Sequence, residues 1–388
     1  LRRESKPVEA SRVLVRALRN HPEAARVHAE LGLTLFSLGL MDQAVRALER
    51  ALHLEPGIKQ YQVNLSGMYH HIGRHEDCIA LGSRVVEKDP TCGLAHMNLG
   101  LSYSSLGNWN ARIEHFEQAT DTLPEHSGAW LNLGLGYENR CADAQANRCF
   151  KQAVRIAPEN LKGWICLATN NLRLGAFREG WEQFSKRFEL DPSLAPKGKT
   201  PIWQGESLAG RSIHLIAEQG LGDLVQFIRF AKPLSEQGAQ VFATVPEKLC
   251  EILETVPGIT ECFSSLAEPP TCDYQSTIME LPRWLGVDET NIPLAGGYLL
   301  AKPASQSMTK QLESLGTKVK VGIVWAGNPN HVNDGRRSMS FDDVACLLDV
   351  PNIHLVSLQM GDRSEQLREH PRVNEVSDWM TEGMTASQ

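Results

Sequence analysis

The segment Gly93-Leu-Ala-His-Met-Asn-Leu-Gly-Leu-Ser-Tyr103, closed by Pro124, carries the pattern that decides the fold. The proline recurs at a constant step of 34 residues, at Pro22, Pro56, Pro90, Pro124, Pro158 and Pro192. A period of this length is that of a repeat made of two antiparallel helices. Such a repeat buries its apolar face only by stacking on its neighbours, so the first half of the chain is predicted to be an α-solenoid.

Several positions of the repeat agree in phase. With each proline at position 32, the full units are 25–58, 59–92, 93–126 and 127–160, with a partial repeat 1–24 before them and a worn capping repeat 161–194 after them. Position 8, where two helices cross closely, is small in every unit: Gly32, Ser66, Gly100, Gly134 and Ala168. Positions 20 and 27 are mostly small, and Arg112 and Arg187 depart from that pattern. Residues 1–192 resemble the tetratricopeptide (TPR) family, which implies a TPR superhelix over 1–194.

Position 6 of the first helix is asparagine in three successive units, at Asn64, Asn98 and Asn132. A primary amide offers two donors and an acceptor, which is enough to pair with a peptide group. The resemblance implies that first helices line the concave surface, and a similar asparagine ladder occurs in the TPR half of the nucleocytoplasmic O-GlcNAc transferases. We therefore expect a protein or peptide to bind there. The alternative is that asparagine only belongs to a common Asn-Leu-Gly repeat pattern.

Composition excludes several classes of function. The chain has 388 residues, which favours two or three domains, and its net charge of −7 gives no basic surface for nucleic acid. No apolar run has the length of a membrane span, and residues 1–20 lack the apolar centre of a secretory signal. Nine cysteines without a Cys-x-x-Cys pair favour reduced thiols, and we expect a cytoplasmic protein. His70, His71 and His75 need not share a face because Gly73 marks a turn, so no metal site is expected.

Residues 192–211 are rich in prolines, glycines and lysines, and we interpret them as a junction. The sequence pattern after them differs from that of the repeats. Strands are expected at 212–217, 241–245, 259–264 and 273–279, with helices at 223–237 and 247–256. A second series begins with a strand at 318–325, followed by a helix at 341–349 and a strand at 353–359. Strands that alternate with helices predict parallel sheets. We expect one Rossmann-like domain at 195–316 and the start of a second at 317–388.

The run Glu218-Gln-Gly-Leu-Gly-Asp223 is the most informative local sequence in this half. Gly220 and Gly222 are expected to let the strand turn sharply into a helix, with Asp223 at the helix start. An acid at a helix N-terminus is also favourable by itself. Together with Pro201-x-Trp203, Leu208-Ala-Gly-Arg211 and Val324-Trp-Ala-Gly-Asn-Pro329, the run resembles bacterial TPR-linked glycosyltransferases, which are similar to the heptosyltransferases of glycosyltransferase family 9.

This resemblance implies two Rossmann-like domains in a GT-B fold, with Asp223 as the catalytic base of an inverting sugar transfer. It further implies that Arg337 and Ser338 contact the phosphates of a nucleotide sugar, which is a substrate, so that no cofactor is needed. Asn328 and His331 lie on the same predicted loop, and we expect them, with Gly220 and Gly222, to bind the substrate or donor as well. We expect the second domain to be incomplete, because the family's donor-phosphate segment has no counterpart in 377–388. The expected function is therefore a TPR-scaffolded glycosyltransferase, with a non-catalytic TPR scaffold carrying a vestigial or truncated transferase domain as the alternative.

Overall fold

The computed structural model describes residues 6–218, 220–264, 270–300, 303, 306–316, 318–330, 334–370 and 373–375. The chain divides into two compact units. The first contains Leu1–Phe242 and Pro270–Ala295, and the second contains Ala243–Pro269 and Gly296–Gln388.

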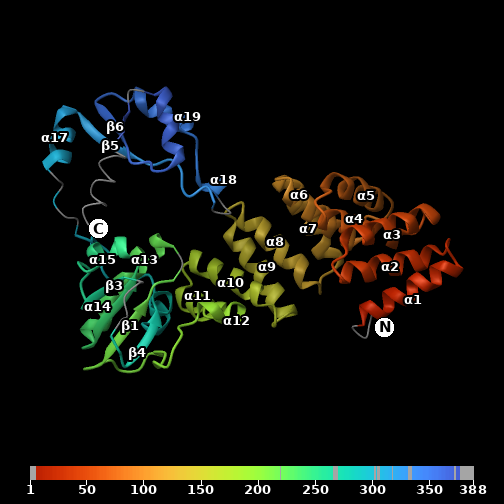
Figure 1. Ribbon diagram of the computed structural model, residues 1–388, viewed down its shortest axis with the longest axis horizontal. Helices are drawn as coiled ribbons and strands as arrows, with labels where there is room; N and C mark the ends of the chain where they lie inside the picture. The colour runs from red at the N-terminus through yellow and green to blue at the C-terminus, as the bar shows by residue number, and fades with distance from the viewer. Residues whose placement is uncertain are drawn as a thin grey trace. The chain divides into compact units, whose positions relative to one another are not determined.

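The first unit begins with paired helices that follow one another along the chain (Figure 1). They are α1 (Pro7–Asn20), α2 (Ala25–Ser37), α3 (Met41–Leu54), α4 (Lys59–His71), α5 (His75–Lys88), α6 (Gly93–Ser105), α7 (Trp109–Thr122), α8 (Ser127–Glu138), α9 (Asp143–Ile156), α10 (Leu161–Arg173), α11 (Phe177–Phe184) and α12 (Arg187–Leu190). The helical solenoid predicted for the first half of the chain is therefore present.

Close crossing of the two helices of a repeat explains the small residue at position 8. A Cβ atom added to Gly134 would lie 2.5 Å from the Phe150 ring, and one added to Gly100 would lie 2.8 Å from the Phe116 ring. Both phenylalanines are fully buried. Because interiors are close-packed, a methyl group here would push the two helices apart.

The turn between the two helices needs a left-handed backbone. Gly39, Gly73, Gly107 and Gly175 occupy the same repeat position and have φ between 73° and 80°. The corresponding residue of the fourth repeat, 127–160, is Cys141, with φ of 56°. An L-residue with a side chain is disfavoured in this region, so this repeat contains a local strain that the other units avoid.

A hydrogen bond that repeats with the period of the chain ties each unit to the proline before it. The side chain at position 4 bonds the proline carbonyl six residues earlier in five successive units. The pairs are His28–Pro22, Gln62–Pro56, His96–Pro90, Trp130–Pro124 and Trp164–Pro158, at 2.8 to 3.0 Å. Histidine, glutamine and tryptophan share an N–H donor, which satisfies a carbonyl left open beyond the end of the preceding helix.

First helices of neighbouring repeats touch one another, although each packs more extensively against the second helix of the preceding repeat. Helices α2 and α4, α4 and α6, and α8 and α10 are in contact. That the first helices line the concave surface stays a prediction, implied by the resemblance to TPR proteins.

A four-stranded sheet follows the solenoid in the order β3-β2-β1-β4. Its strands are β1 (Ser212–Ile216), β2 (Gln240–Val245), β3 (Glu261–Ser264) and β4 (Tyr274–Thr277). Strands β1 and β4 are parallel, in a register that places Ile216 opposite Thr277. The single helix expected at 223–237 is instead α13 (Leu221–Phe227), a 3₁₀ turn at Ile228–Phe230 and α14 (Ala231–Glu236). Pro233 cannot donate a backbone hydrogen bond to the preceding turn, which favours this break.

The second unit contains a three-stranded parallel sheet in the order β5-β6-β7. Its strands are β5 (Val319–Ile323), β6 (Ile353–Ser357) and β7 (Asn374–Glu375), and the helices α17 (Gln306–Ser314), α18 (Asp334–Arg337) and α19 (Phe341–Val344) accompany them. Trp325, Phe341 and Leu355 belong to its core. Among all described residues, no helix combines the length and apolar character that crossing a membrane requires.

A pair of histidines links the two helices of the third repeat, residues 93–126. His96 Nδ1 lies 3.0 Å from His115 Nδ1, and His96 Nε2 lies 3.0 Å from the Pro90 carbonyl. Because a carbonyl only accepts, His96 carries its proton on Nε2, so His115 Nδ1 must donate to His96 Nδ1. Burial, followed by the charge of His96, lowers the pKa of His115, whereas Glu114 acts in the opposite direction.

We predict that acid destabilises the fold through this pair. A lowered histidine pKa means that the unfolded state binds more protons, so stability is lost as pH falls below about 6.5, at no more than about 1.4 kcal/mol per pH unit for one proton. Thermal melts between pH 7.5 and 5.0 should show a smaller loss for His115→Gln than for the wild type. His28→Gln is the matched control because His28 bonds Pro22 alone. An equal acid dependence in wild type and His115→Gln would contradict the prediction.

Candidate functional site

Parallel pairing brings two acidic residues to one edge of the first sheet. Glu218 follows β1, and Glu280 follows β4 in a 3₁₀ turn at Ile278–Glu280. Because Ile216 and Thr277 are register partners, the carboxyl ends of both strands lie side by side. This edge is where open α/β sheets bind ligands.

Arg187 of the solenoid enters this edge and joins both carboxylates. Its Nη2 donates to Glu218 Oε1 at 2.9 Å and its Nε to Glu218 Oε2 at 3.3 Å, whereas Nη1 donates to Glu280 Oε1 at 2.6 Å. Further bonds reach the Thr277 hydroxyl and the Phe184 carbonyl. We call Arg187, Glu218 and Glu280 the junction cluster.

The junction cluster is withdrawn from water. The Arg187, Glu218 and Glu280 side chains are 4%, 5% and 9% exposed. Phe184 and Phe188 cover the guanidinium, with ring centroids 4.5 and 4.1 Å from its central carbon. Burial raises the pKa of Glu280, against the opposing effect of Arg187. One guanidinium shared by two buried carboxylates makes the arginine hard to replace, because its loss would leave both charges without their main partner.

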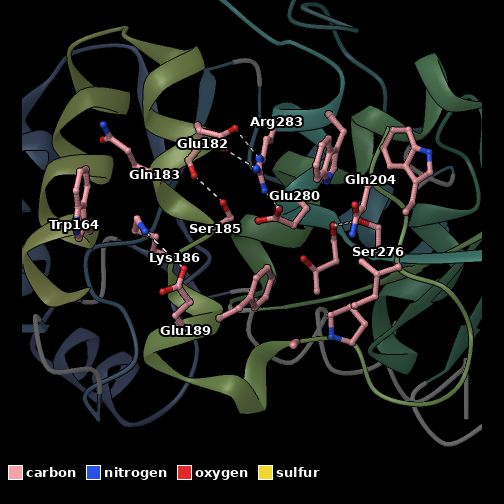
Figure 2. Close-up of a pocket in the computed structure, with 17 residues that line it drawn as sticks. Trp164, Glu182, Gln183, Ser185, Lys186, Glu189, Gln204, Ser276, Glu280 and Arg283 are labelled. Carbon is pink, nitrogen blue, oxygen red and sulfur yellow. Dashed lines mark hydrogen bonds and ion pairs between the residues drawn. The ribbon is translucent and has the colours of Figure 1, made fainter. Parts of the chain in front are cut away.

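A pocket of about 610 Å³ opens beside this cluster (Figure 2). The last solenoid helices supply Trp164, Glu182 and Lys186, and the sheet side supplies Thr277, Glu280 and other lining residues. Figure 2 shows Arg283 between Glu182 and Glu280. The pocket therefore lies where the last repeat meets the carboxyl edge of the sheet, within the first unit.

The charged side chains of the pocket already have partners inside the chain. Arg283 donates to both Glu182 oxygens at 2.9 and 2.7 Å. The Lys186 ammonium lies 5.3 Å from the Trp164 ring centre. Among the described lining residues, the serine hydroxyls donate to backbone carbonyls rather than to a base. The pocket is thus equipped to bind a ligand between aromatic and polar walls, but it contains no nucleophile–base pair.

The predicted base lies close to this edge, outside the pocket lining. Asp223 is half-buried, and its Oδ2 accepts the Gly220 N–H at 3.2 Å at the start of α13. We expected the turn before α13 to require glycine. The backbone at Gly220 does not require it, because its φ of −82° is one that any residue adopts. A Cβ atom on Gly222 would meet no neighbouring atom within 4 Å. Asp223 is therefore a helix-end cap in this structure, and its role as a base stays a prediction.

The predicted phosphate contacts lie in the second unit. Ser338 Oγ accepts the Gly327 N–H at 2.9 Å and donates to the Asp334 carboxylate. Asn328 Oδ1 accepts the Asn330 N–H at 2.9 Å. A Cβ atom on Gly327 would lie 2.8 Å from an Arg337 nitrogen, so the exposed Arg337 guanidinium rests against this loop. The structure gathers Asn328, Arg337 and Ser338 after β5, and His331 lies outside the described residues.

The three asparagines of the solenoid are not equivalent. Asn98 Nδ2 donates to the Val63 carbonyl and to the Ser66 hydroxyl of the preceding repeat, each at 2.9 Å. Asn132 Nδ2 donates to Gly128 O within its own helix, and Asn64 Oδ1 accepts from Gln60. The three asparagines occupy the same position of their repeats, but their side chains make different hydrogen bonds within the chain. Each therefore has a different group available to a bound partner.

The junction cluster was not predicted from the sequence. The available signal was Arg187 itself, which occupies position 27 where earlier units have Ala51, Val85, Ala119 and Ala153. A charged residue at a small core position needs a buried counter-charge. Glu218, directly after an apolar strand, is such a charge, although its 31-residue separation from Arg187 gave no pattern.

Comparison with known proteins supports the repeats. Tetratricopeptide repeat models match residues 1–45, 41–91 and 94–125. "Protein FlbA" of Caulobacter vibrioides is 29% identical over 238 residues, which cover 56% of this chain. The chain thus spans about two fifths (40%) of the length of that relative.

Solved structures similar to this chain cover less than half of it. A TPR protein of Thermus thermophilus is 23% identical and covers 44% of this chain and 92% of its own, with a TM-score of 0.38. MamA of Desulfovibrio magneticus is 19% identical, with coverages of 44% and 96% and a TM-score of 0.39. PilW, a type IV pilus biogenesis factor, is 15% identical, with coverages of 49% and 88% and a TM-score of 0.45.

We predict that Asn98 contributes to stability and that Asn64 does not. Asn98→Ala removes two hydrogen bonds to the preceding repeat, leaving the Ser66 hydroxyl without a donor while the Val63 carbonyl keeps its bond from Ser66, at a cost of about 1–2 kcal/mol. Asn64→Ala removes only a bond to Gln60 in the same helix and should stay within about 0.5 kcal/mol. Urea unfolding measures both values. Equal losses would show that the two amides have the same structural role.

Proposed function

We propose that this chain is a TPR scaffold that holds a segment of another protein and presents it to the carboxyl edge of the first sheet. TPR repeats suit protein–protein interaction, because a curved stack offers a long inner surface. The observation that carries the proposal is the junction cluster. It fixes the last repeat to the sheet through buried, charge-assisted hydrogen bonds. A segment held by the solenoid would therefore have a defined position relative to that edge.

The inner surface of the solenoid would recognise the backbone groups of a bound peptide. Asn64 keeps its amide N–H groups, and Asn98 and Asn132 keep their side-chain carbonyl oxygens beyond the bonds within the chain. An extended segment offers donors and acceptors in alternation, so it could pair with this sequence of groups. Such pairing would depend little on the side chains of the partner.

We predict that Asn64 and Asn132 contribute to segment binding. The Asn64→Ala/Asn132→Ala variant should bind labelled peptides about tenfold more weakly in fluorescence polarisation, since each lost hydrogen bond costs about 0.5–1.5 kcal/mol. Asn98 is left intact because it bonds the preceding repeat. Asn110→Ala is the matched control, since Asn110 lies on the second helix α7 and accepts from Arg140. Unchanged affinity in the double variant would exclude backbone reading by these amides.

We further propose that the α/β half belongs to an inverting glycosyltransferase that resembles the heptosyltransferases. Asp223 would take the proton of an acceptor hydroxyl as its oxygen attacks the anomeric carbon, and the nucleoside diphosphate would leave with the bonding electrons. Arg337 and Ser338 would offset its charge. The position of Asp223 at the carboxyl edge of a parallel sheet, beside the open space at Gly222, supports this proposal. The alternative is a scaffold whose α/β half does no chemistry.

We predict that Asp223→Asn lowers sugar transfer at least about 100-fold, the lower range for loss of a general base. Asparagine still accepts the Gly220 N–H, so the fold should be kept. Asp343→Asn is the matched control, because Asp343 caps α19 from the same third position of a helix. The assay follows the transfer of labelled sugar from a panel of nucleotide sugars by this chain.

The two proposals have different outcomes in this assay. Transfer at the wild-type rate by Asp223→Asn would exclude the base assignment. Absence of transfer by the wild type, with segment binding intact, would favour the scaffold without chemistry.

A further inference from the structure

One side chain connects the solenoid to the segment that leads into the glycine turn. Arg187 begins α12 and binds Glu218 through two nitrogens. Glu218 lies two residues before Gly220 in the sequence, and Gly220 precedes the helix that contains Asp223. The bidentate geometry fixes both distance and orientation, which a lysine ammonium could not do.

A second route connects Glu218 to the same helix. Glu218 Oε1 also accepts the backbone N–H of Met279, which lies in the 3₁₀ turn after β4. This turn is in contact with α13. Glu218 is therefore held from the solenoid side by Arg187 and from the sheet side by Met279.

The helix that follows the turn also rests on the solenoid. The ring of Phe227 in α13 meets the ring of Trp181 in α11 edge-on, with centroids 5.4 Å apart and planes at 87°. Both side chains are buried. An apolar contact stabilises the position of α13 but fixes no hydrogen-bonding direction, so orientation has to come from the charged pair.

We infer that Arg187 is a positioning residue that orients, through Glu218, the segment before α13 and with it Asp223 at the start of that helix. The last repeat thereby helps to hold this segment in position. A shift of that repeat is transmitted to Asp223 by a buried bidentate pair rather than absorbed by a flexible linker. The catalytic consequence rests on the proposed sugar transfer, whereas the mechanical consequence does not.

The two carboxylates of the junction cluster provide a matched pair of variants. Glu218→Met removes the link to the turn and leaves Arg187 paired with Glu280. Glu280→Met leaves Arg187 paired with Glu218, so the link to the turn is kept. Each variant retains one buried carboxylate for the guanidinium, which avoids the severe loss expected when a buried charge has no partner.

Hydrogen exchange of the Gly220 to Leu224 amides in the whole chain tests the inference. Glu218→Met should speed exchange there at least tenfold, whereas Glu280→Met should stay within threefold of the wild type. The Arg187→Met/Glu218→Met variant should resemble Glu218→Met at these amides, because both changes break one link. Glu218→Gln should restore part of the protection by keeping an acceptor. Equal effects of Glu218→Met and Glu280→Met would show a merely structural cluster and overturn the inference.

The exchange result does not depend on sugar transfer. If transfer occurs, Glu218→Met should lower kcat at least tenfold with the donor KM unchanged. If the wild type transfers no sugar, the proposed function fails while the exchange data still decide whether Arg187 positions the turn. Fast exchange in Glu218→Met with an unchanged kcat would show that Glu218 holds the turn and would remove Asp223 from the chemistry.

Discussion

The organisation of the first unit depends on one guanidinium that serves two buried carboxylates. Arg187 comes from a helical repeat, Glu218 from the segment after β1 and Glu280 from the turn after β4, so three separate segments must meet for all of these bonds to form. A buried ion pair of this kind is weak evidence for stability, because desolvation offsets much of the attraction. It is stronger evidence for specificity, since few other arrangements of these segments satisfy all the groups.

The solenoid could be predicted from sequence because each of its constraints repeats. Prolines, small crossing residues and buried leucines recur every 34 residues, and the structure places the position 7 leucines in the interior. The N–H donors at position 4 were equally visible in the sequence, but histidine, glutamine and tryptophan are rarely grouped as one class. Their common partner, a proline carbonyl, becomes apparent only when the chain is folded.

The candidate site could be predicted only in part, because its contacts join residues far apart in the chain. Arg187 and Glu280 are separated by 93 residues, and no period connects them. The sequence placed Asp223 at the start of a helix, and that is where it lies, yet the glycines beside it have no backbone requirement that identifies them. In the same way, three asparagines in phase proved to have three different hydrogen-bonding surroundings. Periodicity fixes the position of a residue, but not its partner.

Departure from a repeat is therefore the more informative signal in this chain. Arg112 and Arg187 both replace small residues, and both remain buried. Arg112 stays inside the solenoid, where it donates to the Asn132 carbonyl of the next unit. Arg187 belongs to the last repeat, which has no following repeat to supply an acceptor. The segments after β1 and β4 provide two carboxylates instead. A terminal repeat must cover its open face, and here that cover is the α/β region itself. The same substitution thus ends the solenoid and attaches it to the edge of the sheet where Asp223 lies.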